Sequence, residues 1–556
     1  MSRESRRRRK TGGETDAPSR VASELPAWAP WALAAVTLLV FIRVTGNGFI
    51  NFDDDAYITT NPHVLGGLTT DNVRWALTNV AYFCWQPLTW LSHQLDVTLF
   101  GLNPGPPHFI NALIHALNAA LCFRLLKRIT GRDWAALVGA ALWALHPLRV
   151  ESVAWAAERK DVLSVCFYLL ATIWYVERRA YWQTTLWFVL GMAAKPTLVS
   201  FPVVVTMLDV WPLGRWNLRE KIPWFVLAAL LSIGTVKGAA TMGATAALGA
   251  LPLGVRVAHA CWSYLLYVVQ TVWPFGLAVI YPYSETIPAW QPVLGLAFIV
   301  GASVAAWRFR ARYPGALLGW AWYVVTLAPM SGVVQAGPQM GADRYSYVPA
   351  IGLMLVVISV WPRVRVAGLV LAGALGVVTF RQISYWKGSV TVFEHAMAVT
   401  SNNWIAMRNL GGAYITAGDT LRAVALFKQS LSLTPNQPET NYQFGSVLAA
   451  KNDWARALPY FDAALKLSPR YASAEYARGT ALAHAGKSAE AAQSLERALT
   501  LELAPSYKAE AHNTLGVIAI NAGDRAGAER HFKEALVLNP ALEVAQRNLT
   551  ALRTMR

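Results

Sequence analysis

The sequence predicts an all-α protein with two parts, a polytopic transmembrane helical domain followed by an α-solenoid. Apolar residues make up 55% of the chain, more than a soluble protein of this size needs to fill a core. They are concentrated between about residues 28 and 380, in blocks close to the ~20 residues that cross a bilayer. After residue 381 the chain becomes polar and alanine-rich, and a 34-residue repeat begins.

The first element is a basic tail, residues 1–27, which we expect in the cytoplasm. The net charge of +17 would suit a nucleic-acid-binding protein, but the basic residues flank apolar blocks, which is typical of the positive-inside rule. We expect 28–45 to be a retained first span. The basic stretch is long for a cleavable signal peptide, and no clear small-residue cleavage site follows the apolar run.

An inside start places the next segment, 46–107, outside the membrane as a long polar loop. Eleven further apolar blocks follow, so that twelve segments are candidate spans. They lie near 108–126, 134–148, 161–177, 182–194, 196–211, 223–240, 257–275, 290–307, 316–333, 346–361 and 365–380.

Parity argues against twelve crossings. Basic clusters at 308–312 and 363–365 belong inside, so the chain leaves residue 380 on the outside. An inside start and an outside end require an odd number of crossings, about eleven. One block between 182 and 275 is therefore re-entrant or interfacial, or two blocks are divided wrongly. The membrane domain spans 28–381.

The second domain, 382–556, is a tetratricopeptide-repeat solenoid. Small and aromatic positions recur every 34 residues, the period of two-helix repeats that stack on their neighbours. The recurring residues are Phe393, Phe427, Phe461 and Leu495, with Gly411, Gly445 and Gly479. The expected repeats are 402–435, 436–469, 470–505 and 506–540, followed by a polar capping helix at 541–556.

The outer loop carries three adjacent acids, Asp53, Asp54 and Asp55. A carboxylate just outside a span lies where a lipid-borne donor presents its head group, and a sugar-accepting hydroxyl needs a general base. The alternative is a helix cap or an incidental cation site. On a helix the three side chains would point to different faces, so they cannot all serve one substrate.

Two later segments place charge at the same outer side, 146–161 and 343–347. Their basic side chains are candidates to hold a carrier phosphate and stabilise it as a leaving group. Lys195, between two apolar blocks, is a similar case. Interfacial snorkelling and ordinary salt bridges are the alternatives.

A polar stripe follows one helical face in the block that begins at residue 108. We expect it to hold helices together; a metal pair is disfavoured because His108 and His115 lie two turns apart. The cysteines show no metal spacing and no disulfide framework, so no metal or cofactor is expected. The stripe is His108, Asn111, His115 and Asn118, and the cysteines are Cys84, Cys122, Cys166 and Cys261.

The order of several short motifs resembles one family. The motifs are Phe49-Ile50-Asn51-Phe52-Asp53-Asp54, Asn61-Pro62-His63-Val64, Gln86-Pro87-Leu88-Thr89, Gly101-Leu102-Asn103-Pro104, the spaced residues His108, Asn111 and His115, then His146-Pro147, Glu151-Ser152-Val153 and Arg159-Lys160-Asp161-Val162-Leu163. Together with the repeats, they resemble the transmembrane and tetratricopeptide-repeat glycosyltransferases of the GT-C type and their bacterial relatives. Repeats alone would not indicate a function.

The resemblance implies a GT-C-like membrane fold and inverting transfer of a sugar, mannose in this family, from a polyprenyl phosphate to a protein hydroxyl on the outer face. It implies Asp54 or Asp53 as the base, with Asp54 favoured and Asp55 an additional acid. The donor phosphate would be bound by Arg344, Arg159, Lys160 and Lys195, supported by His146, Glu151, Asp161 and His108.

The expected partners are therefore the lipid-linked sugar, membrane lipid and an acceptor protein held by the repeats, without nucleic acid. Alanine- and arginine-rich usage favours a bacterial inner-membrane protein with periplasmic repeats. Three alternatives remain open. They are a membrane-anchored scaffold, an oligosaccharyltransferase or O-antigen-ligase-like enzyme, and a transporter.

Overall fold

The computed structural model describes residues 25–80, 85–241, 252–283, 287–333, 339–363 and 365–554. The basic tail up to residue 24 and Cys84 lie outside these ranges. The chain forms two compact units, one ending at Gly388 and the other beginning at Ser389, which also takes in 278–282. The boundary between the units was expected at residue 382.

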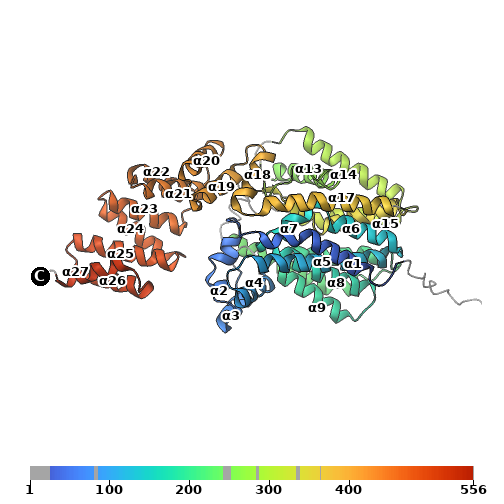
Figure 1. Cartoon of the computed structure of the whole chain (residues 1–556), viewed down its shortest axis with the longest axis horizontal. Helices are drawn as coiled ribbons and strands as arrows, with labels where there is room; N and C mark the ends of the chain where they lie inside the picture. The colour runs from blue at the N-terminus through green and yellow to red at the C-terminus, as the bar shows by residue number, and fades with distance from the viewer. Residues whose placement is uncertain are drawn as a thin grey trace, which may run out of the picture. The chain divides into compact units, whose positions relative to one another are not determined.

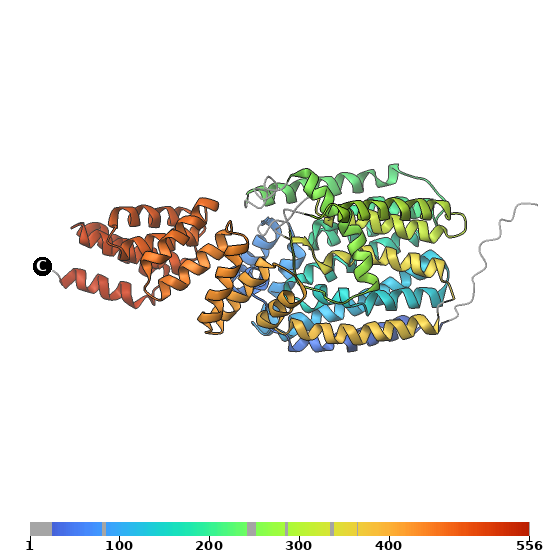
Figure 2. The same ribbon diagram turned by 90° about the horizontal axis from the view of Figure 1, so that it is seen from above.

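The first unit is a bundle of helices with short single-turn segments at its connections (Figures 1 and 2). Its amino-terminal half contains α1 (Ala29–Phe41), η2 (Ile42–Gly46), η3 (Asp55–Thr59), α2 (Pro62–Leu65), α3 (Thr70–Thr78), α4 (Pro87–Phe100), α5 (Gly105–Thr130), α6 (Asp133–Ala144), η4 (Pro147–Arg149), α7 (Val150–Ala154), η5 (Ala156–Glu158), α8 (Arg159–Val176), α9 (Tyr181–Ala194), η6 (Pro196–Ser200) and α10 (Phe201–Val210). Its later half contains η7 (Arg219–Lys221), α11 (Ile222–Thr241), α13 (Leu253–Val272), α14 (Trp290–Arg308), α15 (Pro314–Leu327), η8 (Ala328–Met330), the short strand β2 (Gln339–Gly341), η9 (Asp343–Ser346), α16 (Pro349–Val360), α17 (Val366–Ile383) and η10 (Ser384–Trp386).

Four helical segments of the described chain are long and apolar enough to cross a membrane, by length and composition. They are Ala29–Gly46, Gly105–Thr130, Trp290–Arg308 and Val366–Trp386, and three shorter apolar helices accompany them. The protein is therefore a multi-pass membrane protein. Only 6% of the span that contains α14 is buried, and its outward side chains are apolar, as a lipid-facing helix requires.

The longest helix of the bundle, α5, defines its two ends. α5 begins beside the carbonyl oxygen of Thr45 and extends for 26 residues, about 39 Å, so its termini lie at opposite ends. Lys127 and Arg128 lie in its last turn, and Arg128 pairs with Glu177 at 2.9 Å. We call this the Arg128 end and the opposite one the Asp53 end. At the Asp53 end the backbone amide of Gly48 donates to the carbonyl of Lys387 at 2.9 Å.

The polar face of α5 holds helices together, as the sequence predicts. The side-chain amides of Asn111 and Asn118 donate to the carbonyls of Trp155 and Val162, at 3.0 and 2.9 Å. The ring of His115 contacts the hydroxyl of Tyr347 at 2.6 Å. Each bond joins α5 to a different segment, so the buried polar atoms fix how the helices are arranged.

The second unit is a series of helix pairs, which confirms the predicted repeats. It contains β1 (Tyr281–Pro282), α18 (Ser389–Val399), α19 (Trp404–Thr416), α20 (Thr420–Leu433), α21 (Pro438–Ala450), α22 (Trp454–Leu467), α23 (Ala472–His484), α24 (Ser488–Thr500), α25 (Pro505–Asn521), α26 (Arg525–Leu538) and α27 (Glu543–Thr554). The 34-residue pattern is explained by packing, because a Cβ on Gly445 would lie 2.7 Å from the ring of Phe461. The second helices often start at an aspartate cap, such as Asp419 and Asp453.

Candidate active site at the Asp53 end

The three adjacent acids of the outer segment point to different surroundings. Asp54 is fully buried, and its two carboxylate oxygens accept backbone N–H bonds from Ile50 and Ala157, each at 2.8 Å. The bond from Ala157 ties the segment to the connection between α6 and α8, 103 residues away. Asp54 therefore holds two separate parts of the chain together.

Burial is also the main influence on the Asp54 carboxyl. It raises the pKa of Asp54 to about 7, although the two backbone N–H bonds favour the carboxylate and act in the opposite direction. A carboxyl enclosed in this way cannot receive a proton from an acceptor hydroxyl without leaving its partners.

Asp53 faces a cation instead. Its carboxylate lies 3.3 Å from the ammonium group of Lys160, and 35% of its side chain is exposed. The same ammonium group lies over the ring of Tyr57, 4.2 Å from the centroid. Of the two favoured aspartates, Asp53 is thus the one that combines access with a charged partner.

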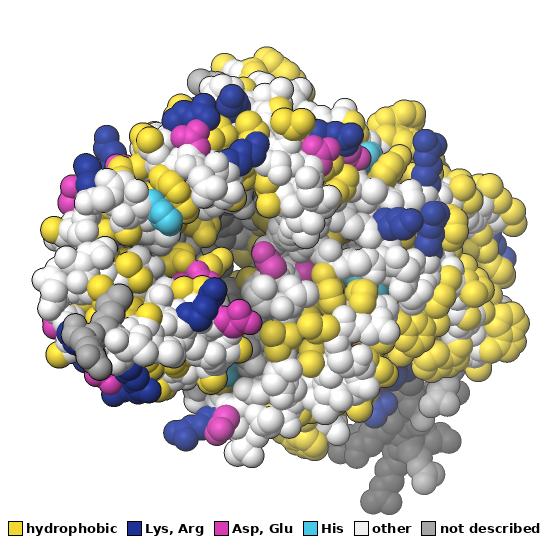
Figure 3. All heavy atoms as spheres, turned by 60° about the vertical axis from the view of Figure 1, so that its left-hand side comes forward, with side chains coloured by type: hydrophobic (Ala, Val, Ile, Leu, Met, Phe, Trp, Pro, Cys, Tyr) yellow, Lys and Arg dark blue, Asp and Glu magenta, His cyan; other side chains and the backbone are white. Residues whose placement is uncertain are grey.

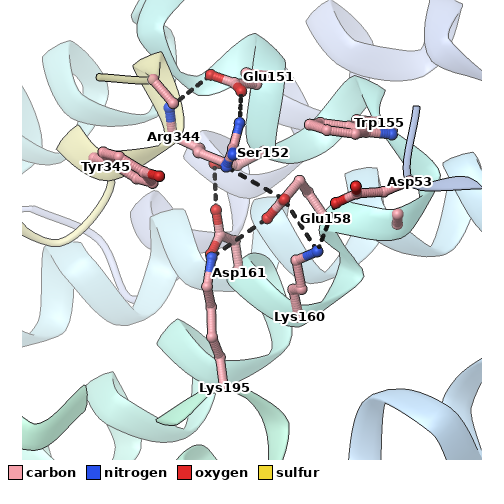
Figure 4. Close-up of polar contacts among 12 residues, drawn as sticks. Asp53, Glu151, Ser152, Trp155, Glu158, Lys160, Asp161, Lys195, Arg344 and Tyr345 are labelled. Carbon is pink, nitrogen blue, oxygen red and sulfur yellow. Dashed lines mark hydrogen bonds and ion pairs between the residues drawn. The ribbon is translucent and has the colours of Figure 1, made fainter. Parts of the chain in front are cut away.

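Glu158 is the centre of a charged network (Figure 4), although we did not predict it as a site residue. Its carboxylate lies 3.2 to 3.4 Å from three cationic groups. Glu151 and Asp161 extend the network through close contacts with Arg344 and Lys195. We call this set, after its position expected from the sequence, the outer-edge cluster; its members are Asp53, Glu151, Glu158, Lys160, Asp161, Lys195 and Arg344.

Two glutamates of the outer-edge cluster are shifted in opposite directions. Burial alone would raise the pKa of Glu158, but the three surrounding cations together bring it below its usual value. Burial raises the pKa of Glu151 to about 7, because Arg344 compensates for it only in part. The cluster therefore holds one firmly ionised carboxylate at its centre and a more easily protonated one at its edge.

Aromatic rings enclose the guanidinium group of Arg344. Its central carbon lies 5.3 Å from the ring centroid of Trp155 and 5.2 Å from that of Tyr345. A cavity of about 30 Å³ adjoins it, lined among others by Asp161, Lys195 and Arg344. This volume has room for a water molecule.

Four predicted site residues lie outside the outer-edge cluster; they are Asp54, described above, and Arg159, His146 and His108. Arg159 is fully buried on the other side of α8, where its guanidinium bonds Asp96 at 2.9 Å and the carbonyl of Pro107 at 2.8 Å. The ring of His146 contacts the carbonyl of Thr271 at 3.0 Å, and His108 is buried on the polar face of α5. The phosphate-binding role of Arg159 stays a prediction, and its contacts favour a structural one.

Within the described residues, no group of metal-ligating side chains is found at the outer-edge cluster. The one group of three His, Cys, Asp or Glu residues close enough to share an ion lies in the repeats. The cluster instead offers an accessible carboxylate beside cations, an arrangement suited to proton abstraction near an anionic group.

The fold and the site together define a class, a multi-pass helical membrane protein with a charged cluster at one end of its bundle and tetratricopeptide repeats. Family comparisons agree with this class. Residues 87–236 match the family model described as dolichyl-phosphate-mannose-protein mannosyltransferase, and 442–508 and 509–542 match tetratricopeptide-repeat models. The resemblance inferred from the sequence motifs is confirmed.

Curated relatives are named as protein O-mannosyl-transferases. The protein O-mannosyl-transferase Tmtc2 of Drosophila melanogaster is 28% identical over 197 residues, which cover 32% of this chain and 21% of that protein. The mouse protein O-mannosyl-transferase TMTC1 is 32% identical over 178 residues, covering 30% of this chain and 18% of that protein. The matched region thus spans about a fifth of the length of these relatives.

Solved structures resemble the repeats. YrrB, a TPR protein, is 20% identical, with a TM-score of 0.26 over 33% of this chain and 88% of that chain. MamA from Desulfovibrio magneticus RS-1 is 25% identical, with a TM-score of 0.25 over 28% of this chain and 85% of that chain. Since TM-scores this low define no shared arrangement, the repeat assignment rests on the family models and the helix pairs.

Proposed function

We propose that the chain is a membrane glycosyltransferase that transfers a sugar, mannose, from a polyprenyl phosphate to a hydroxyl group of an extracytoplasmic acceptor protein. The observation that carries this proposal is the contact between Asp53 and Lys160. It places a partly exposed carboxylate in one network with the cations Lys195 and Arg344. The similarity to protein O-mannosyl-transferases supports the choice of sugar and acceptor.

In the proposed reaction Asp53 is the general base. The acceptor hydroxyl gives its proton to the carboxylate while its oxygen forms a bond to the anomeric carbon. The bond between that carbon and the phosphate oxygen breaks in the same displacement, and polyprenyl phosphate leaves. The first choice from the sequence was Asp54, but its enclosed carboxylate and its two backbone bonds favour Asp53 for this step.

The phosphate of the donor would be bound by Arg344, Lys195 and Lys160. Each of these cations already contacts a carboxylate, so the phosphate would take the place of Glu151 or Asp161. Arginine is suited to this exchange because its planar fork matches the oxygens of a phosphate. Protonation of Glu151, whose pKa is raised to about 7, would ease it.

We place the Asp53 end outside the membrane and the Arg128 end in the cytoplasm, with the repeats periplasmic in a bacterial inner membrane. Basic residues at the Arg128 end support this orientation. An odd number of crossings, about eleven, stays the expectation. Four helical segments of the described chain are long and apolar enough to span the membrane, and three shorter apolar helices accompany them.

α13 fits the interfacial segment that parity requires. Near its start, Arg256 donates to the carbonyl of Val333 at 2.9 Å, and near its end the carbonyl of Thr271 contacts His146 at 3.0 Å. Val333 lies between α15 and α16 on the side of Arg344, and His146 precedes α7. These two contacts support a position of α13 near the Asp53 end, and we infer that this helix does not cross the membrane.

The repeats would hold the acceptor polypeptide. Stacked helix pairs present long surfaces suited to extended chains, and the first helices carry tyrosine pairs such as Tyr476 and Tyr507, with ring centroids 5.1 Å apart. Nucleic acid is not an expected partner. On the face shown in Figure 3, acidic and basic side chains are interspersed rather than gathered in one basic area.

The proposal is tested by transfer of labelled mannose from polyprenyl-phosphate mannose to envelope proteins, using the detergent-solubilised full chain. We expect Asp53→Asn to abolish transfer and Asp55→Asn, a matched change in the same motif, to retain it. Full transfer by Asp53→Asn would exclude the proposed base. Binding of partner proteins by the unmodified chain without any sugar transfer would favour the membrane-anchored scaffold.

A further inference from the structure

A trio of metal-ligating side chains lies in the last helix pair of the repeats. His512 is on α25, and His531 and Glu534 lie one turn apart on α26. Their ligand atoms all lie within 4.8 Å of one another. Sequence spacing does not reveal this group, because His512 is 19 residues from His531 and only the packing of the two helices brings them together.

The three ligand atoms form a compact triangle. The Nδ1 atoms of His512 and His531 are 3.1 Å apart, and the Glu534 carboxylate oxygen lies 3.0 Å from the first and 3.5 Å from the second. Two ligands of a tetrahedral zinc ion with bonds of 2.0 to 2.1 Å are about 3.3 Å apart. The triangle therefore already has the dimensions of one face of such a site.

Hydrogen bonding satisfies all three atoms in one arrangement, in which both Nδ1 atoms carry a proton and donate to the same Glu534 oxygen. The two N–H groups then lie side by side, with their nitrogen atoms 3.1 Å apart. A divalent cation at the centre would accept a lone pair from all three atoms at once.

The surrounding helices hold the ligands rigidly. His531 precedes Phe532, which is fully buried, and a Cβ on Gly516 would lie 2.5 Å from the Phe532 ring. His512 stands one turn before Gly516 on α25. The close contact of glycine and phenylalanine that stacks the repeat thus also fixes the separation of the two histidines, as a preformed metal site requires.

We propose that His512, His531 and Glu534 bind Zn²⁺, with water at the fourth position. Two histidines and a glutamate are a known zinc ligand set that leaves one position open. The side chains are 17%, 18% and 45% exposed, and His512 and Glu534 line a surface hollow of about 630 Å³. An ion can enter and exchange there, and the site does not depend on the proposed transfer reaction.

The test is a titration of Zn²⁺ alone into the detergent-solubilised full chain, expressed without a polyhistidine tag. We expect one tight equivalent, measured by competition with a chromophoric chelator. The Zn²⁺ affinity of the double variant His512→Ala/His531→Ala should fall by at least about 100-fold, because loss of the hydrogen-bond partners of metal ligands already lowers metal affinity 10- to 100-fold. His484→Ala, a histidine of the repeats stacked on Trp454, is the matched control and should bind normally.

Two further measurements distinguish a loss of Zn²⁺ binding from misfolding of the variant. Circular dichroism should be the same for the double variant and the parent, and the milder Glu534→Gln should also weaken binding. Co²⁺ added to the parent should give the intense visible absorption of tetrahedral coordination, and none with the double variant. Equal Zn²⁺ affinity in parent and double variant, or no tight equivalent in the parent, would overturn the proposal.

Discussion

Two neighbouring aspartates have separate tasks because their partners differ. Asp53 has one ammonium group beside it and some access to solvent, whereas Asp54 receives two backbone amides in a buried place. We expect Asp53→Asn to remove transfer with little change in thermal stability. Asp54→Ala should instead destabilise the fold by about 1–3 kcal/mol, because it leaves two buried N–H groups without an acceptor. Thermal unfolding and transfer, measured on the same preparations, separate the two effects.

Asp54 also predicts how stability depends on pH. Its pKa is raised by burial to about 7 in the folded chain, so the folded state binds a proton more tightly than the unfolded state. The resulting stability is complete below about pH 4 and is lost as pH rises through 7. As pH rises from 5 to 8, the unfolding temperature of the parent chain should therefore fall, and that of Asp54→Asn should fall less. Identical slopes would contradict the shift.

At the scale of elements, Arg159 joins three helices. It starts α8, pairs with Asp96 of α4 and bonds the Pro107 carbonyl in α5. We expect Arg159→Met to lower stability by roughly 3–5 kcal/mol, because the buried Asp96 charge loses its partner. The apparent KM of the folded fraction for polyprenyl-phosphate mannose should stay unchanged. A large rise in that KM would restore the predicted phosphate-binding role.

The sequence predicts where helices occur more readily than it predicts where their side chains point. The 34-residue period locates the helix pairs because each of its recurring glycines meets a phenylalanine or leucine partner within one repeat. Neighbouring residues on a helix, however, point about 100° apart. Arg159 and Lys160 therefore face different surroundings. The packed structure shows that, of these two residues, Lys160 belongs to the outer-edge cluster and Arg159 does not. Glu158 is similar, since its partners Lys195 and Arg344 come from distant segments.

At the scale of the whole molecule, the proposed orientation predicts which residues a reagent can reach. In a chain without its native cysteines, Asp71→Cys and Lys487→Cys should react in intact cells with a membrane-impermeant maleimide. Arg310→Cys, exposed near the Arg128 end, should react only after the membrane is opened. The reverse labelling pattern would place the outer-edge cluster in the cytoplasm, where the proposed donor does not present its sugar.

The hydrogen bond from the Ala157 backbone amide to the Asp54 carboxylate affects how a newly synthesised chain folds. The acidic segment is synthesised early, but Ala157 follows 103 residues later, and Lys387, the partner of Gly48, follows later still. Since chains emerge at roughly 5–20 residues per second, the segment must stay unpaired for several seconds beside the translocation machinery. A newly made chain therefore cannot complete the outer-edge cluster until Arg344 has been synthesised, and products truncated before that residue would contain every acid of the motif without the assembled cluster.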